Sequence, residues 1–211
     1  MTTERRTVRR ARPTIAFLLA LSTITCGESR SVDGIGTTKE LPRIARPVTE
    51  HDTRAVMEAV LRDDGLLGAA ERPMFHRDVD VGWLRSDHGE WWSRAELRAG
   101  ALTSFFEANE SGVRDDAWLG ALGAGMIESS VLDAHFADRT PESGWASVLR
   151  GPPECTVLVS ITAPGFSEDG HQALIFMSTT RGFLEGGGLL YLLEHQQDTW
   201  VVADYLVELI Q

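Results

Sequence analysis

A histidine and two aspartates stand at alternate positions in this chain: His76, Asp78 and Asp80. On an extended strand, side chains two residues apart point to the same side, so these three would form one row. Imidazole and carboxylate groups in such a row are suitable ligands for a divalent metal ion. The chain is so rich in Asp and Glu, however, that short acidic runs are expected without a metal. We therefore expect a solvated polar face opposite Val79 and Val81, and no metal ion or other cofactor.

A second set of acid and base groups lies in the C-terminal third, where a sheet could bring Glu185, His195 and Asp204 together. No nucleophile motif accompanies them. The segment 165–169 lacks the second glycine of the Gly-x-Ser-x-Gly turn. Gly186 to Gly188 lack the Lys-Ser/Thr ending of a phosphate-binding loop. These features favour a non-catalytic protein, and a small extracytoplasmic hydrolase using histidine and carboxylate groups is the alternative.

The six tryptophans provide the remaining binding candidates. We assign Trp92 to the start of a helix and Trp200 to a strand, which leaves Trp83 and Trp91 as surface candidates. Aromatic faces stack on sugars and peptides. The two residues are therefore candidates for a ligand-binding surface, and the sequence identifies neither the ligand nor whether the partner is a protein or a glycan.

The N-terminus has the layout of a secretory signal. Five arginines precede the apolar run Ile15–Leu21, and small or polar residues then lead to Cys26. The run is shorter than the roughly 20 residues of a membrane span. A cysteine at such an exit is typical of a bacterial lipoprotein, although Thr23 to Thr25 depart from the usual lipobox. We predict a signal peptide at 1–25 and a lipid on Cys26, with ordinary cleavage after Ser22 as the alternative.

The composition of the chain after residue 25 indicates a tether followed by one domain. Residues 26–50 mix Gly, Ser, Thr and Pro without periodicity, which predicts a flexible tether with an end-to-end distance of about 25–30 Å. Residues 51–211 are long enough for a single domain. Beyond residue 25 the chain holds 15 basic and 30 acidic residues, so binding to nucleic acid is disfavoured.

The chain has two cysteines, Cys26 and Cys155. Lipidation of Cys26 would leave Cys155 a lone thiol, whereas an unmodified Cys26 would allow a disulfide between the two.

Local patterns predict helices in the first part of the domain. Asp52 is predicted to cap a helix over 53–64, which carries an apolar stripe and ends at Gly65. Ser93 and Glu96 have the spacing of a capping box for a second helix, and residues 144–149 form a third. Between them, the alternation over 78–83 predicts a half-buried strand.

The C-terminal third predicts a sheet. Four runs rich in Val, Ile, Leu, Phe and Tyr are separated by turn-forming residues, at 156–162, 172–179, 189–195 and 200–207. This spacing is typical of an antiparallel meander. We expect an α+β fold in which N-terminal helices pack on one side of a C-terminal four-stranded antiparallel β-meander, with Gly186 to Gly188 opening its third strand.

The same third carries a pattern of short motifs: Pro164-Gly165-Phe166-Ser167, Asp169-Gly170, Ala173-Leu174, Gly186-Gly187-Gly188, Leu192-Leu193-Glu194 and Trp200-Val201-Val202. This pattern resembles a group of uncharacterised bacterial exported proteins with a C-terminal β-meander. The resemblance implies a fold and an exported location, and it implies no activity. Together with the N-terminus, it predicts a membrane-anchored lipoprotein of the cell envelope that acts as a non-catalytic binding or support module.

Overall fold

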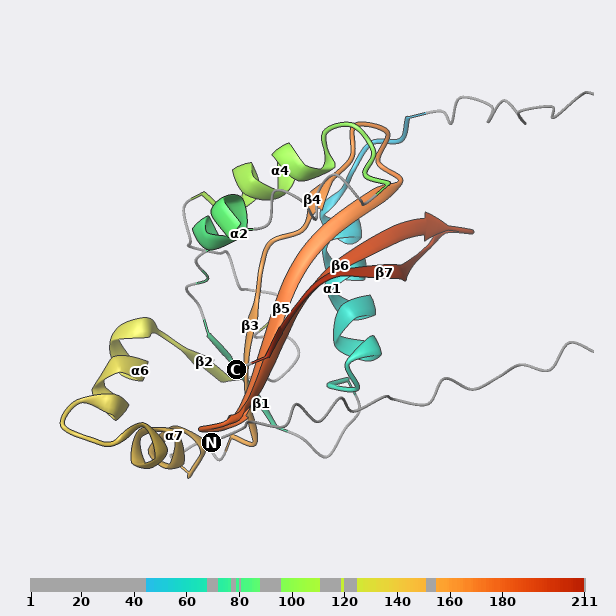
Figure 1. The fold of residues 1–211 in the computed structure, drawn as a ribbon. Coiled ribbons are helices and arrows are strands. Elements are labelled where there is room, and N and C mark those ends of the chain that lie inside the picture. Colours follow the sequence, from blue (N-terminus) through green and yellow to red (C-terminus); the bar gives the residue numbers. More distant parts are fainter. Residues whose placement is uncertain are drawn as a thin grey trace, which may run out of the picture. The chain divides into compact units, whose positions relative to one another are not determined.

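The computed structural model describes residues 45–67, 72–76, 79, 81–87, 96–110, 119, 125–150 and 155–210. These residues lie within one of the two compact units of the chain, Pro42–Gln211. The predicted signal peptide, Cys26 and most of the predicted tether lie outside the described residues. The helices are α1 (Glu50–Asp63), α2 (Gly82–Asp87), α4 (Ala101–Ala108), α6 (Ser129–Phe136) and α7 (Pro141–Arg150). The strands are β1 (Pro73–His76), β2 (Gly125–Ile127), β3 (Val157–Ile161), β4 (Gly165–Phe166), β5 (Gln172–Gly182), β6 (Glu185–Gln196) and β7 (Thr199–Ile210) (Figure 1).

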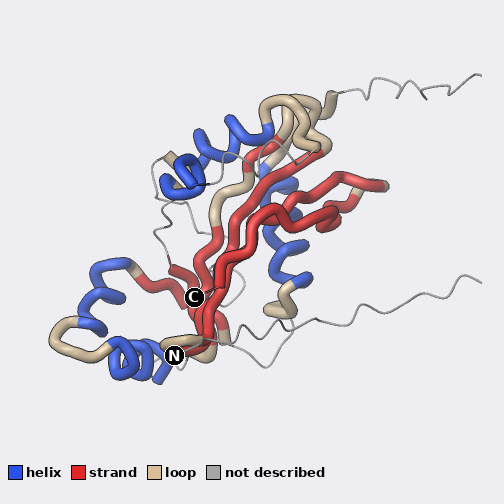
Figure 2. Tube along the Cα trace, viewed as in Figure 1, coloured by secondary structure: helices blue, strands red, loops and turns tan. Residues whose placement is uncertain are grey.

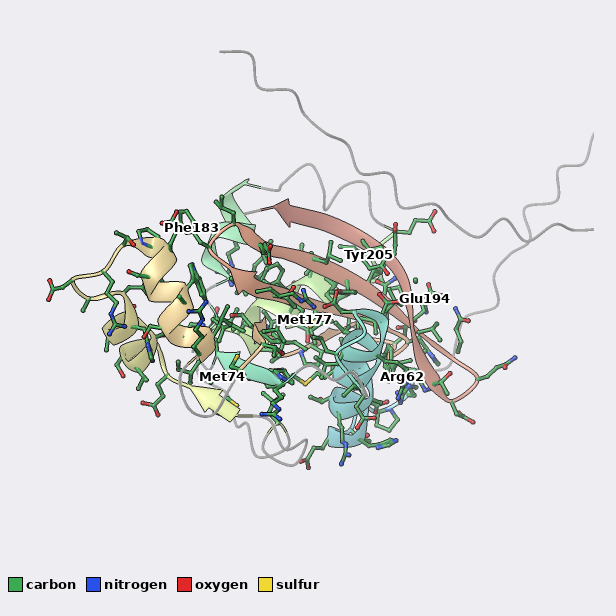
Figure 3. All side chains as sticks on the ribbon, turned by 90° about the horizontal axis from the view of Figure 1, so that it is seen from below. Arg62, Met74, Met177, Phe183, Glu194 and Tyr205 are labelled. Carbon is green, nitrogen blue, oxygen red and sulfur yellow. The ribbon has the colours of Figure 1, made fainter. Side chains whose placement is uncertain are left out.

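The strands form one seven-stranded sheet in the order β2-β1-β3-β5-β6-β7, with β4 also paired to β5. The fold is therefore α+β. The prediction of a simple four-stranded meander is wrong, because β1 and β2 extend the sheet beyond β3 in parallel orientation. From β3 through β5 and β6 to β7 the pairing is antiparallel. The long strands β5 and β6 pair along their length, and Phe183, in the turn that joins them, lies at the opposite end of this pair from Glu194 (Figure 3).

A threonine side chain bridges the interruption between β3 and β4, which both pair with β5. The Thr162 hydroxyl accepts a hydrogen bond from the Phe176 amide at 2.7 Å, and the Thr162 amide donates to the Phe176 carbonyl at 2.8 Å. Thr162 is fully buried. Because buried backbone groups must be paired, this hydroxyl keeps β5 satisfied where its neighbour departs from regular pairing.

Helix α1 packs on one face of the sheet. Its stripe of Val56, Met57, Val60 and Leu61 is buried as predicted, against β-strand residues such as Phe75 and Ile175. The predicted start is wrong by a few residues. Thr49 is the N-cap, and Asp52 instead occupies the third helical position of a capping box with Thr49. Both side chains thereby satisfy amides that a helix start leaves without acceptors.

Helices also cover the opposite face, contrary to the expected one-sided arrangement (Figure 2). Leu84 of α2 and Phe105 of α4 pack against Phe176 and Leu190 in one apolar cluster. A second cluster gathers Met74, Ile127, Cys155 and Leu158 beneath α6 and α7. Alternate side chains of β5 and β6 therefore enter cores on both sides, which explains why both faces of these strands are apolar.

Two local predictions fail in the region between α1 and α4. The half-buried strand predicted over 78–83 is wrong, because Gly82 already belongs to α2. Ser93 of the predicted capping box lies outside the described residues, but the helix predicted from it is not present at Glu96, because residues 96–98 are not helical and Gly100 is the N-cap of α4. The Arg98 amide instead donates to the Gln172 side chain at 2.8 Å. A contact with the sheet thus takes up the amide of a residue that was expected to be helical.

The two edges of the sheet differ from its centre. One edge is β2, which has three residues. The other is β7, where the pairing with β6 shifts register twice and leaves Ala203 and Leu206 without opposite residues. Beside the first shift, the Asp204 carboxylate accepts the Tyr205 amide at 2.8 Å. Such bulges increase the local twist of an edge strand.

Candidate functional site

The carboxyl ends of the three parallel strands bring polar side chains together. His76, the last residue of β1, is aligned with Ile127 of β2 and with Ser160 of β3. Ser129 follows Ile127 by two residues and is the first residue of α6. Ligand sites of open sheets are usually found at the carboxyl ends of parallel strands. We refer to His76, Ser129 and Ser160 as the His76 site.

The imidazole of His76 contacts both serines. Its Nε2 lies 2.9 Å from Ser129 Oγ, and its Nδ1 lies 3.5 Å from Ser160 Oγ. All three residues are half-buried. With the proton on Nδ1, Nε2 accepts the hydrogen bond of the Ser129 hydroxyl, while Ser160 Oγ accepts from Nδ1. This is the orientation in which a histidine acts as a base toward a serine.

The His76 site lies between two apolar clusters on one face of the sheet. Met74 and Leu158, two residues before His76 and Ser160, belong to the cluster beneath α6 and α7. On the other side, Ser178 is the register partner of Ser160, and Phe176 belongs to the cluster beneath α2 and α4. The site is therefore a polar strip of the sheet bordered by packed side chains on both sides.

A second polar cluster joins the start of the described chain to one end of the sheet. We refer to Arg46, Asp52, Gly170, His195 and Trp200 as the Arg46 junction. The Arg46 guanidinium forms an ion pair with Asp52 and donates to the Gly170 carbonyl at 3.0 Å. It also lies 5.5 Å from the centre of the Trp200 ring, whose Nε1 donates to Asp52 at 3.0 Å. The ring of His195 packs edge-on against Trp200.

Charge and burial shift pKa values in and beside this junction. Burial would raise the pKa of Asp52, but hydrogen bonds from Trp200 and Thr49, with the charge of Arg46, lower it overall. Burial followed by the positive charge of Arg46 lowers the pKa of His195. The contacts are those expected of a network that holds the chain in place, because each charged group has an opposite charge or a hydrogen-bond donor.

A neighbouring ion pair fixes the turn before β5. Arg98 donates to Asp169 at 2.6 Å, and its guanidinium lies 3.8 Å from Glu194. Burial would raise the pKa of Asp169, but hydrogen bonds from Ser167, the His171 amide and Arg98 lower it to about 2. The segment leading into α4 is thereby attached to the β4–β5 turn.

The structure places only part of the predicted site. Asp78, Asp80 and Trp91 lie outside the described residues, and Trp83 falls on α2 without a described side chain. Among the described residues, no group of three His, Cys, Asp or Glu side chains is arranged to hold a metal ion. Glu185 and His195 stand near opposite ends of β6, about 33 Å apart along the strand, so they do not form one acid–base site.

Sequence reasoning missed the serine partners of His76. Ser129 is 53 residues from His76 and Ser160 is 84 residues away, so no local spacing connects them. One signal was present: the short apolar run Gly125–Ile127 precedes Glu128-Ser129-Ser130, which is a strand-to-helix change.

No protein-family model, curated protein or solved structure matches this chain. In the described part of the chain, no helix has the length and apolar character needed to cross a membrane.

Proposed function

We propose that this chain is an exported lipoprotein whose domain is held at a membrane surface of the cell envelope through a lipid on Cys26, where it binds a partner or supports the envelope. The arginine-rich start, the apolar run and the cysteine at its exit support export and anchoring. The acidic composition of the remainder argues against nucleic acid as the partner.

The observation in the fold that supports this role best is the Arg46 junction. The last residues of the predicted tether, from Arg46 onward, do not simply lead into α1. Arg46 is bonded through its amide to Asp169, at 3.2 Å, and through its side chain to Gly170 and Asp52. A tether joined at this point would transmit load to the β4–β5 turn and to Trp200 of β7, as well as to the first turn of α1 through Asp52.

The anchor is tested by fractionation of cells that express the full chain. The wild type is expected in the membrane fraction, with a mature first residue at Cys26 that carries the mass of a diacylglyceryl group. Cys26→Ser should move the protein to the soluble fraction. Cys155→Ser is the matched control, because it removes the other, buried thiol and should leave the protein in the membrane. A soluble wild type, or a mature chain that begins at another residue, would refute the anchor.

Hydrolysis is the second candidate function, and one observation favours it: the 2.9 Å contact between His76 Nε2 and Ser129 Oγ. This function is compatible with the anchor, because the His76 site and the Arg46 junction share no residue.

A further inference from the structure

We propose that Ser129 and His76 are the nucleophile and the general base of a site that hydrolyses neutral carboxylic esters. This activity goes beyond anchoring and does not depend on it. A serine becomes a nucleophile when a base lies within hydrogen-bond distance of its hydroxyl, at about 2.6–3.2 Å. Ser129 Oγ and His76 Nε2 meet this condition at 2.9 Å.

The position of Ser129 in the fold also suits a nucleophile. It stands where β2 changes into α6, separated from the strand by Glu128 alone. A strand-to-helix turn presents a serine at the edge of a sheet, and the amide of the next residue can then stabilise a developing oxyanion. That residue is Ser130, whose amide belongs to the first helical turn, where no intrahelical acceptor exists. The carbonyl of Glu128 is already bonded to the amides of Val131 and Leu132.

The reaction balances with water as the only co-substrate. Ser129 Oγ attacks the ester carbonyl carbon while its proton passes to His76 Nε2. The carbon–oxygen bond to the alcohol then breaks, and His76 returns the proton to the leaving oxygen. Water next attacks the acyl carbon, gives a proton to His76, and releases the acid as Ser129 Oγ recovers its proton. No atom changes oxidation state.

The charge of the molecule selects the substrate class. The chain carries a formal net charge of −11, and the exposed Glu128 adjoins Ser129. A negative field of this kind repels anions and lowers their concentration at the site. Esters without a negative charge are therefore the expected substrates, and phosphate esters are excluded from the proposal. An alkoxide is also a far better leaving group than the amide anion that an unprotonated amide would release, which favours esters over amides.

Ser160 is a positioning residue in this arrangement. Its hydroxyl lies 3.5 Å from His76 Nδ1 and can accept a hydrogen bond from this nitrogen in the tautomer that leaves Nε2 available as an acceptor. Ser160→Ala should therefore shift the pH dependence of the reaction. At high pH, where the imidazole is neutral with or without this hydroxyl, the rate at which Ser129 is labelled should change little.

The test is labelling of the full chain, purified in dodecyl maltoside, with a neutral alkyl fluorophosphonate. In this reaction Ser129 Oγ bonds to phosphorus and fluoride leaves. Trypsin releases residues 115–139 as one peptide, in which Ser129 and Ser130 are the only hydroxyl side chains. The expected adduct lies on Ser129 in the wild type and in Ser130→Ala, and it is absent in Ser129→Ala. His76→Gln should slow labelling by about 100-fold or more.

A second serine provides an internal control. Ser147 Oγ lies 2.8 Å from His135 Nδ1, but Arg139 donates to the same oxygen at 2.6 Å, which reduces its nucleophilicity. Its tryptic peptide, residues 140–150, should stay unlabelled. An unlabelled 115–139 peptide in the wild type, or an adduct on Ser130 or Ser147 instead, would overturn the proposal. The position of the adduct on the wild-type chain tests the proposal even if a variant fails to fold. A soluble chain labelled at Ser129 would refute the anchor and support the esterase site.

Discussion

At the scale of single residues, Asp52 receives most of the hydrogen bonds of the Arg46 junction. Its carboxylate accepts from Trp200 Nε1, from the Thr49 amide at 2.9 Å and from the Thr49 hydroxyl at 2.8 Å, besides pairing with Arg46. Asp52→Ala would leave these donors and a positive charge without their acceptor. We expect the free energy of unfolding to fall by about 2–4 kcal/mol, measured by urea denaturation.

The control for this variant lies on the same helix. Glu58 accepts from Arg54 at 2.7 Å, and the Arg54 side chain is 56% exposed. Exposed pairs of this kind contribute about 0–1 kcal/mol, so Glu58→Ala should change the unfolding free energy much less than Asp52→Ala. Equal losses in the two variants would show that the buried junction contributes no more than a surface pair.

His195 should make stability depend on pH. Its pKa in the folded state is lowered from 6.5, first by burial and then by Arg46. The unfolded chain therefore takes up the proton at a higher pH than the folded chain, so the stability contributed by His195 is present above about pH 6.5 and is lost as the pH falls below it. His195→Gln should reduce the fall in unfolding free energy between pH 7 and pH 5.

The comparison variant for this pH series is His51→Gln, because His51 is an exposed residue of α1. Urea denaturation at half-unit steps of pH measures both variants. If His195→Gln follows the pH profile of the wild type, the imidazole of His195 is not responsible for the dependence in this window.

At the scale of elements, the packing of α4 on β4 depends on one glycine. A Cβ atom at Gly165 would overlap the backbone of Phe105 in α4. Because backbone atoms cannot rotate away, Gly165→Ala must separate the helix from the strand. We expect a loss of about 3 kcal/mol or more in unfolding free energy, the usual result of overpacking that a core cannot relieve.

Gly182 provides the matched substitution in the same sheet. An added Cβ there would find its nearest neighbour, the Glu185 side chain, at 3.8 Å. Gly182→Ala should change the free energy of unfolding, measured by urea denaturation, by no more than about 0.5 kcal/mol, as expected away from packed sites. A small effect of Gly165→Ala as well would contradict the close packing of α4.

The sequence predicts elements well where one local pattern determines them. The stripe of α1 is an example, since Val56, Met57, Val60 and Leu61 repeat with the helical period and are all buried. Local patterns do not predict the secondary structure correctly where contacts with residues far apart in the sequence determine it. Val79 and Val81 alternate like a strand, yet α2 begins directly afterwards at Gly82. The strands β1 and β2 have four and three residues, too few for a periodicity to be recognised.

The His76 site illustrates the same limit. His76 was identified from its neighbours Asp78 and Asp80, which share its segment. Its described partners come from the two adjacent strand ends, which only parallel pairing of β1 with β2 and β3 brings together. Parallel pairing joins segments that are far apart in sequence, so a site at such strand ends cannot be recovered from residue spacing.

At the scale of the whole molecule, burial predicts which parts open first. The central strands β5 and β6 contribute residues to the cores on both faces, whereas α6 has no buried residue. Regions with few buried apolar contacts open locally at low free energy. Amide exchange should therefore be slow at 173–177 and 190–193, and faster by about a hundredfold or more in 129–136.

Exchange followed by mass spectrometry measures this difference directly. Helix α1, whose stripe is buried, is the internal reference and should exchange more slowly than α6. Equal protection of α6 and the central strands would mean that the domain opens only as one cooperative unit.

The two unusual edges of the sheet have a consequence for solubility. Chains that are confined to a surface collide more often than chains in free solution, and an open strand edge is a template for intermolecular pairing and aggregation. Here β2 offers only three residues, while β7 is bent by two register shifts and has the Tyr205 amide already bonded to Asp204. Neither described edge presents a long, flat row of backbone groups, so we expect little edge-to-edge pairing between copies of this domain, even at high density.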